Sequence, residues 1–161
     1  MAIRWKLPPP AKVYEAFSAL ADGRVRVDEA GRAAVTSSGG DRVYAVEWTA
    51  EPGEALSVTS NDNASYWQGY LGYPIVAVLI ASGRVKADES VTRALAGIPW
   101  HDLNARFKRD YDAAVEHVLG ELATRGVDRE RIVAEVDRVM RQLADLELER
   151  RGRGRRPPGR G

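Results

Sequence analysis

The segment Asn61–Tyr73 holds the densest group of side chains that could bind a ligand or a partner. Aromatic rings that lie beside amides and carboxylates line ligand pockets and anchor protein interfaces. We therefore predict a ligand or partner site here, joined by residues at the start of a later helix if that helix packs nearby. Its candidate residues are Asn61, Asp62, Asn63, Tyr66, Trp67, Gln68, Tyr70, Trp100 and His101. The alternative is that the rings cover a sheet edge while Asn61 and Asp62 satisfy backbone amides in a turn and a helix cap.

The two histidines favour neither a metal site nor a catalytic pair. His101 and His117 are sixteen residues apart, which corresponds to about 24 Å along one straight helix. His101 precedes Asp102, but neighbouring residues of a helix point in different directions. We therefore expect Asp102 to cap the helix and His101 to be partly exposed.

Other recognisable catalytic sets are missing from the sequence. It contains no cysteine, which excludes thiolate metal sites, disulfides and cysteine nucleophiles. Gly69 and Gly72 do not belong to a phosphate-binding motif, and the serines lack the context of a nucleophile elbow. Most carboxylates of the C-terminal half have an arginine three or four residues away, which is typical of solvated helix faces. We predict no catalytic residue, metal or cofactor, and an unrecognised enzyme site at Asn61–Tyr73 remains an alternative.

The C-terminal tail is the basic part of an otherwise acidic chain. The net charge is +1, yet outside residues 150–161 the chain has 18 bases against 23 acids. Six tail residues could neutralise phosphates: Arg150, Arg151, Arg153, Arg155, Arg156 and Arg160. We predict weak, salt-sensitive contact with nucleic acid or another polyanion. The alternative is a solubilising end in a chain that uses arginine throughout.

The first third of the chain changes from a helical period to a strand period. Val13, Phe17 and Leu20 mark one face of a helix over residues 11–21. Alternating patterns then predict strands at 24–27, 34–37, 42–48 and 55–60, with a hairpin turn at 38–41. We expect a small antiparallel meander of three or four strands, covered by the first helix.

The remainder predicts helices. We expect residues 74–82 to form a short buried helix, because Pro74 suits its first turn and Gly83 follows its end, with a buried strand as the alternative. Asp88 is expected to cap a helix over 89–96. Apolar spacing predicts one long helix over 102–124 and a last helix over 129–150, paired as an antiparallel hairpin. The apolar stripe of helix 129–150 is wider than one neighbour needs, so it could also form a homodimer, with Leu143–Leu148 meeting a second copy.

These observations predict a single α+β domain over residues 1–149 and a disordered tail over 150–161. The longest apolar run, Tyr73–Ala81, is too short to cross about 30 Å of hydrocarbon, so we expect no membrane contact. The absence of cysteine and of a signal-like segment favours a cytoplasmic location. The leading functional hypothesis is a non-catalytic binding or assembly module. The alternatives are a small-ligand-binding protein or unrecognised enzyme, and a nucleic-acid accessory protein.

Overall fold

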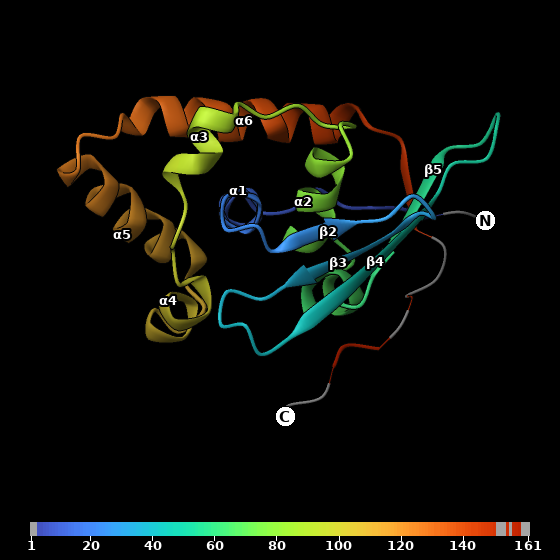
Figure 1. The fold of residues 1–161 in the computed structure, drawn as a ribbon, viewed down its shortest axis with the longest axis horizontal. Helices are drawn as coiled ribbons and strands as arrows, with labels where there is room; N and C mark the ends of the chain where they lie inside the picture. The colour runs from blue at the N-terminus through green and yellow to red at the C-terminus, as the bar shows by residue number, and fades with distance from the viewer. Residues whose placement is uncertain (1–2, 151–153, 155, 159–161) are drawn as a thin grey trace.

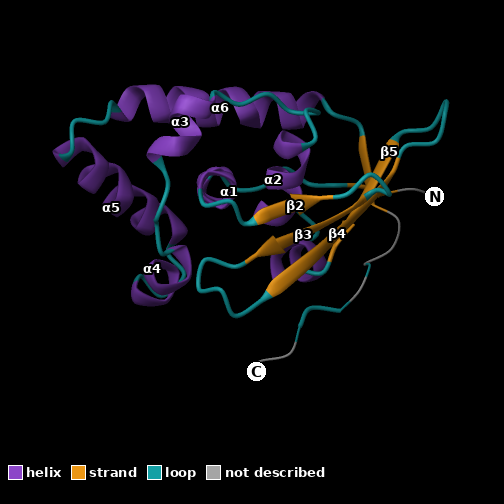
Figure 2. Ribbon diagram, in the orientation of Figure 1, coloured by secondary structure: helices purple, strands orange, loops and turns teal. Residues whose placement is uncertain are grey.

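The computed structural model describes residues 3–150, 154 and 156–158. Within this part of the chain, seven helices and a six-stranded sheet form a mixed α+β fold (Figure 1). The predicted fold class is therefore confirmed. Figure 2 shows the helices gathered mainly along one side of the sheet.

The sheet contains the predicted meander and two additional strands. In spatial order it runs β1-β6-β5-β4-β3-β2, and every neighbouring pair is antiparallel except β5 and β6, which are parallel. Alternation explains the meander. Ala33 and Val35 of one strand and Tyr44 and Val46 of the next are buried, while their neighbours along each strand are more exposed. The strands are β1 (Ile3–Arg4), β2 (Val25–Val27), β3 (Arg32–Thr36), β4 (Val43–Thr49), β5 (Leu56–Ser60) and β6 (Leu148–Arg150).

Strand β6 corrects the predicted end of the last helix. That helix, α6 (Arg129–Asp145), ends at Asp145 rather than at 150, and β6 inserts between β1 and β5. Leu148 is only 4% exposed, so its burial and the pairing on both sides stabilise the strand. Arg150 pairs with Ile3 and belongs to the sheet, not to a disordered tail. Most of the predicted tail, residues 151–153, 155 and 159–161, lies outside the described residues.

The first α-helix is the centre of the helical layer. Helix α2 lies against the sheet, α1 packs on α2, and α3, α5 and α6 surround α1 (Figure 1). Residues 11–19 are consecutively buried, so the polar residues of α1 need partners inside the protein. The helices are α1 (Ala11–Ala21), the π-helix η1 (Ala64–Gln68), α2 (Tyr73–Ala81), α3 (Glu89–Ala94), α4 (Trp100–Arg106), α5 (Tyr111–Thr124) and α6 (Arg129–Asp145).

The predicted helix over 102–124 is wrong, because two helices occupy that range. Lys108 and Arg109 take left-handed backbone conformations, with φ of 54° and 66°, between α4 and α5. Asp110 then caps α5 by accepting from the Ala113 amide at 3.1 Å. Asp102 does not cap α4, which has Pro99 at its N-cap. Helices α5 and α6 are joined by a short turn and diverge from it (Figure 1).

Candidate functional site

A polar cavity of about 100 Å³ lies where α1, the β3–β4 hairpin and α4 meet. Drug-sized sites usually measure about 300–1,000 Å³, so this cavity suits a compact ligand. Side chains from six separate parts of the chain line it: Glu15, Arg24, Ser37, Ser38, Tyr44, Tyr73, Trp100, His101 and Asn104. Most of them carry hydrogen-bonding groups, which is the composition of a polar binding site.

Glu15 on α1 forms the most buried charge of the lining. It is 5% exposed, and its two carboxylate oxygens have different neighbours. Asn104 Nδ2 donates to Oε1 at 2.6 Å, and Lys12 Nζ lies 3.3 Å from Oε2. A buried charge needs such pairing, so these two residues hold the Glu15 carboxylate in place.

Lys12 supports this ion pair from the same face of α1. Its ammonium lies 4.4 Å from the centre of the Tyr111 ring, a favourable cation–π distance. Burial by itself lowers the pKa of Lys12, but the Glu15 carboxylate and Tyr111 outweigh it and raise the pKa above its ordinary value. Lys12 therefore stays charged at neutral pH and neutralises Glu15.

Arg24 is held in place from one side. Its Nη1 donates to the Thr36 carbonyl at 2.7 Å, and its Nε lies 3.5 Å from Asp22 Oδ2. Asp22 is itself fixed, because its Oδ1 accepts from the Gly97 amide at 2.7 Å. Within residues 3–150, neither Nε nor Nη2 of Arg24 makes a hydrogen bond. The guanidinium is thus positioned with donor capacity left over.

Two tyrosines and a tryptophan form the aromatic walls. The rings of Tyr44 and Tyr73 meet edge to face, with centroids 6.3 Å apart. Burial raises the pKa of Tyr73, so its hydroxyl stays protonated and can donate. Neither tyrosine hydroxyl bonds to another described residue. Trp100 contributes only its ring, because its Nε1 already donates to Ser18 Oγ at 2.8 Å.

The turn of the β3–β4 hairpin is tied to the start of α4. Ser38 Oγ accepts from the His101 amide at 2.9 Å, and Ser37 Oγ donates to Asp41 Oδ1 at 3.0 Å. These bonds hold the hairpin and α4 around the cavity. His101 is exposed, so its imidazole lies at the solvent side of the lining.

Comparison with known proteins places the chain in a family. The model of a family described as uncharacterised conserved protein UCP014422 matches residues 5–149. The chain belongs to that family. The matched range includes every residue that lines the cavity, and it ends within β6. No curated protein and no solved structure matches the chain.

Of the site residues predicted from sequence, Trp100 and His101 line the cavity, together with Tyr73 from the end of the predicted segment. Asn61 and Asp62 lie elsewhere and bond within the fold. Asn61 Oδ1 accepts from the Ala45 amide at 2.7 Å. The buried Asp62 accepts from Ser60 and Ser65, including both the hydroxyl and the amide of Ser65. The Asn61 bond reaches across to β4 and is neither a turn nor a cap contact, whereas the Asp62 bond to the Ser65 amide lies at the start of η1, as in the alternative that the sequence offered.

The rest of the predicted segment surrounds η1. Trp67 is 55% exposed and packs edge to face with Tyr66, with ring centroids 4.6 Å apart. Arg150 is one of the residues predicted to bind a polyanion. Its Nη2 donates to the Ser65 and Tyr66 carbonyls at 3.2 and 3.1 Å, so its side chain bonds within the fold. The other predicted residues differ in burial: Asn63 and Gln68 are exposed, and Tyr70 is half-buried.

Sequence reasoning missed the cavity residues of the first third of the chain. Ser37 and Tyr44 were expected only as members of the predicted strands, and Ser38 only as part of the hairpin turn. Glu15 and Arg24 received no role. The one local signal was the Lys12–Glu15 spacing on a helix, which is far more common on solvated faces.

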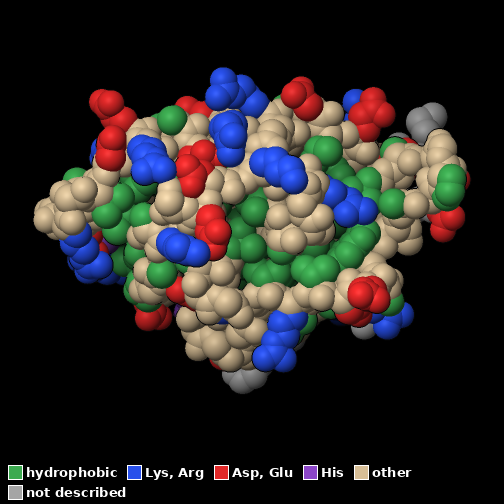
Figure 3. Space-filling model, turned by 45° about the horizontal axis from the view of Figure 1, so that its top comes forward, with side chains coloured by type: hydrophobic (Ala, Val, Ile, Leu, Met, Phe, Trp, Pro, Cys, Tyr) green, Lys and Arg blue, Asp and Glu red, His purple; other side chains and the backbone are tan. Residues whose placement is uncertain are grey.

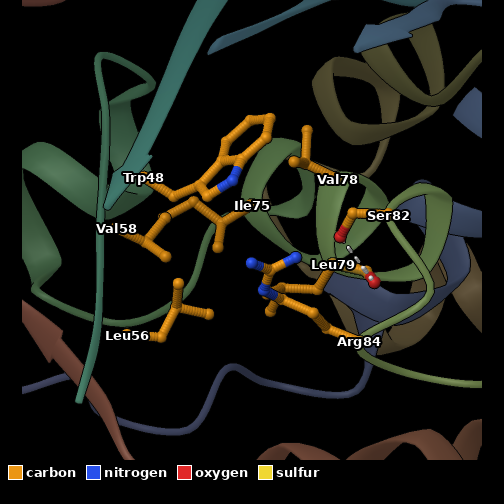
Figure 4. Close-up of a pocket in the computed structure, with 8 residues that line it drawn as sticks. All are labelled: Trp48, Leu56, Val58, Ile75, Val78, Leu79, Ser82 and Arg84. Carbon is orange, nitrogen blue, oxygen red and sulfur yellow. Dashed lines mark hydrogen bonds between the residues drawn. The ribbon is translucent and has the colours of Figure 1, made fainter. Parts of the chain in front are cut away.

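Two other hollows lie elsewhere on the described part of the molecule. Figure 4 shows an apolar crevice in which Trp48 and Leu56 face Val78 and Leu79 of α2. Its volume of about 10 Å³ is near the minimum for one water molecule. A hollow of about 350 Å³ lies on the outer face of β2–β4, with charges of both signs beside alanines.

The described part of the chain has neither a metal-binding cluster nor a membrane-spanning helix. It holds no group of three or more acidic or histidine side chains that could bind a metal ion. None of its helices combines the length and apolar character needed to cross a bilayer. On the face shown in Figure 3, Lys and Arg side chains are interspersed with Asp and Glu, without a large patch of one sign.

Proposed function

We propose that this protein is a binding module that takes a compact polar molecule into the cavity between α1, the β3–β4 hairpin and α4. The observation that carries the proposal is that several hydrogen-bonding groups of one cavity have no partner among the residues that the structure describes. Arg24 Nη2 and the hydroxyls of Tyr44 and Tyr73 are such groups. Groups held in position before binding lose little freedom when a ligand arrives.

Binding fits the cavity better than catalysis does. A general base needs a carboxylate or imidazole available to the substrate and oriented by a third group. Glu15 is already engaged by Lys12 and Asn104. In the described part of the chain, no side chain bonds to the imidazole of His101 to orient it. Arg24 and the tyrosine hydroxyls remain suited to hold a ligand.

Ligand-detected NMR with a set of compact polar compounds tests the proposal. Tyr73→Phe removes one hydroxyl and keeps the buried ring, so binding of a cavity ligand should weaken about 3- to 10-fold. The matched control is Tyr70→Phe, which removes a hydroxyl outside the cavity lining and should leave affinity unchanged. Failure of every compound to bind, or equal weakening by both variants, would contradict the proposal.

A homodimer through residues 129–150 is a second proposal. Leu143 and Leu148 are buried within their own chain, at 3% and 4% exposure. Val133, Met140 and Leu146 are half-buried, and they supply the apolar surface on which such a dimer depends. Light scattering at high micromolar protein concentration tests this proposal. A molecular mass that corresponds to a monomer would contradict it.

A partner site around η1 is a third proposal, and the exposed ring of Trp67 supports it. A cross-linker placed at position 67 tests this proposal, and the absence of any cross-linked partner would contradict it.

A fourth proposal is that the tail binds polyanions and that the protein is cytoplasmic. Polyanion binding rests on Arg151, Arg153, Arg155, Arg156 and Arg160, since Arg150 is engaged in the sheet. Equal retention on a polyanion column by the full chain and by a chain that ends at Arg150 would exclude the tail.

A further inference from the structure

We infer that the cavity ligand is a small monocarboxylate whose carboxylate is held by Arg24. This inference rests on the proposed binding function and adds the chemical class of the ligand. Its basis is the charge balance of the lining, the shape of the donor set and the small volume.

The charge balance favours an anion. Glu15 is the acidic residue of the lining, and Arg24 and His101 are its basic residues. The charge of Glu15 is neutralised by Lys12 at 3.3 Å, and its Oε2 is sealed from solvent. Asp22 lies 3.5 Å from Arg24 Nε, and neither this nitrogen nor Glu15 Oε2 makes a hydrogen bond within the described residues. The two groups differ in what remains, because Asn104 donates to Glu15 Oε1 whereas Arg24 Nη2 has no partner there. The cavity therefore has more cationic than anionic character at the surface a ligand would meet.

The donor geometry favours a carboxylate. A guanidinium presents its N–H groups in a planar fork that matches the two oxygens of a carboxylate. Thr36 and Asp22 occupy one part of the Arg24 fork, and Nη2 has no partner among residues 3–150. Tyr44 and Tyr73 line the same cavity as Arg24, with ring centroids 6.3 Å apart, and their hydroxyls have no partner among residues 3–150. A tyrosine hydroxyl is therefore available to donate to the second oxygen of the same ligand.

Volume and charge count exclude larger or more highly charged anions. A dianion such as phosphate would bring a second negative charge close to Glu15 without a second available cation. Lysine is missing from the lining, and Lys12 is already paired with Glu15. About 100 Å³, walled by the rings of Tyr44, Tyr73 and Trp100, leaves room for a short carbon skeleton next to the carboxylate.

The test compares acids with their neutral amides on the full-length protein. Acetate and propionate are titrated against acetamide and propionamide at constant ionic strength, with inorganic phosphate as a further probe, and binding is followed by NMR. We expect the acids to bind at least about tenfold more tightly than the amides. Arg24→Gln should weaken the acids about 10- to 100-fold, the usual effect of a hydrogen bond to a charged group.

The control for Arg24→Gln is Arg26→Gln. Arg26 is exposed, lies two residues further along the chain and lines the outer hollow instead, so acid binding should not change. Arg24→Lys keeps the charge and loses the fork, so it should bind acids more weakly and still prefer them to amides. The comparison of acids and amides on the unaltered protein decides the question even if Arg24→Gln does not fold.

The outcomes separate this inference from the proposed function. Amides that bind as tightly as acids, with both weakened by Tyr73→Phe, would overturn the carboxylate assignment and leave a binding cavity. Phosphate that binds more tightly than the acids would also overturn it. If no acid, amide or other compact compound binds, the proposed function fails as well.

Discussion

Asp62 and Gly72 are packed so closely that each restricts the other. Asp62 is 4% exposed and is held by Ser60 and Ser65, while the Ser65 hydroxyl accepts from the Gly72 amide at 3.0 Å. A methyl group added at Gly72 would overlap the Asp62 carboxylate. The absence of a side chain at 72 is therefore what allows the buried carboxylate to link β5, η1 and the start of α2.

We predict that Gly72→Ala lowers the free energy of unfolding by about 2–4 kcal/mol, because Asp62 must move and lose hydrogen bonds. The control is Gly120→Ala on α5, where an added methyl meets nothing within 4 Å. Alanine favours the helix there, so stability should rise by roughly 0.5–1 kcal/mol. Urea unfolding measures both variants. A Gly72→Ala protein as stable as the parent would show that Asp62 tolerates displacement.

At the scale of single residues, the chemistry of a side chain indicated which residues could line a site, but not what each one does in the fold. Trp100 and His101 were candidates because of their chemistry, and they do line the cavity. Glu15 was missed because its role depends on Asn104, 89 positions along the chain. Asp62 illustrates the converse, since a carboxylate in a polar loop can cap a turn as readily as bind a ligand. Only the tertiary contacts show whether such a carboxylate caps a turn or binds a ligand.

The break between α4 and α5 places the start of α4 beside the hairpin. Residues Lys108 and Arg109 adopt left-handed conformations, and the Arg109 amide donates to the Asn104 carbonyl at 2.8 Å. The helical spacing of Leu103, Phe107 and Tyr111 continues through the break, so periodicity predicted a single helix. Strands β2–β5 were predictable because their alternation agrees with their burial and with turn residues between them.

Glycine at position 109 should stabilise the protein. A left-handed conformation costs a non-glycine residue about 1–2 kcal/mol, and part of this is offset because glycine gives the unfolded chain more freedom. We predict that Arg109→Gly raises the free energy of unfolding by up to about 1 kcal/mol. Ala105→Gly, within α4, should lower it by about 1 kcal/mol. Thermal unfolding provides the measurement, and a loss of stability in both variants would mean that Arg109 makes a stabilising contact that outweighs its backbone strain.

Across the whole molecule, the two ends of the chain complete the sheet together. Strand β6 lies between β1 and β5, and the Trp5 amide donates to the Leu148 carbonyl at 3.2 Å. Arg150 lies 5.0 Å from the centre of the Trp5 ring and also bonds to η1. Three residues carry too little pattern to predict a strand, and the pairing of Leu148 with Leu56 depends on contacts distant in sequence. The sequence thus predicted the central meander but not how the sheet is completed.

A pair of shortened chains separates the sheet from the tail. A chain that ends at Glu147 lacks β6, so it loses the burial of Leu148 and leaves β1 without its partner. We predict that it loses about 3 kcal/mol or more of unfolding free energy, the scale of removing a buried leucine. A chain that ends at Arg150 keeps β6 and the bonds from Arg150 to Ser65 and Tyr66, so its urea midpoint should stay close to that of the full chain. Equal midpoints for both shortened chains would show that β6 contributes little, whereas a large loss on ending at Arg150 would assign a structural role to the tail.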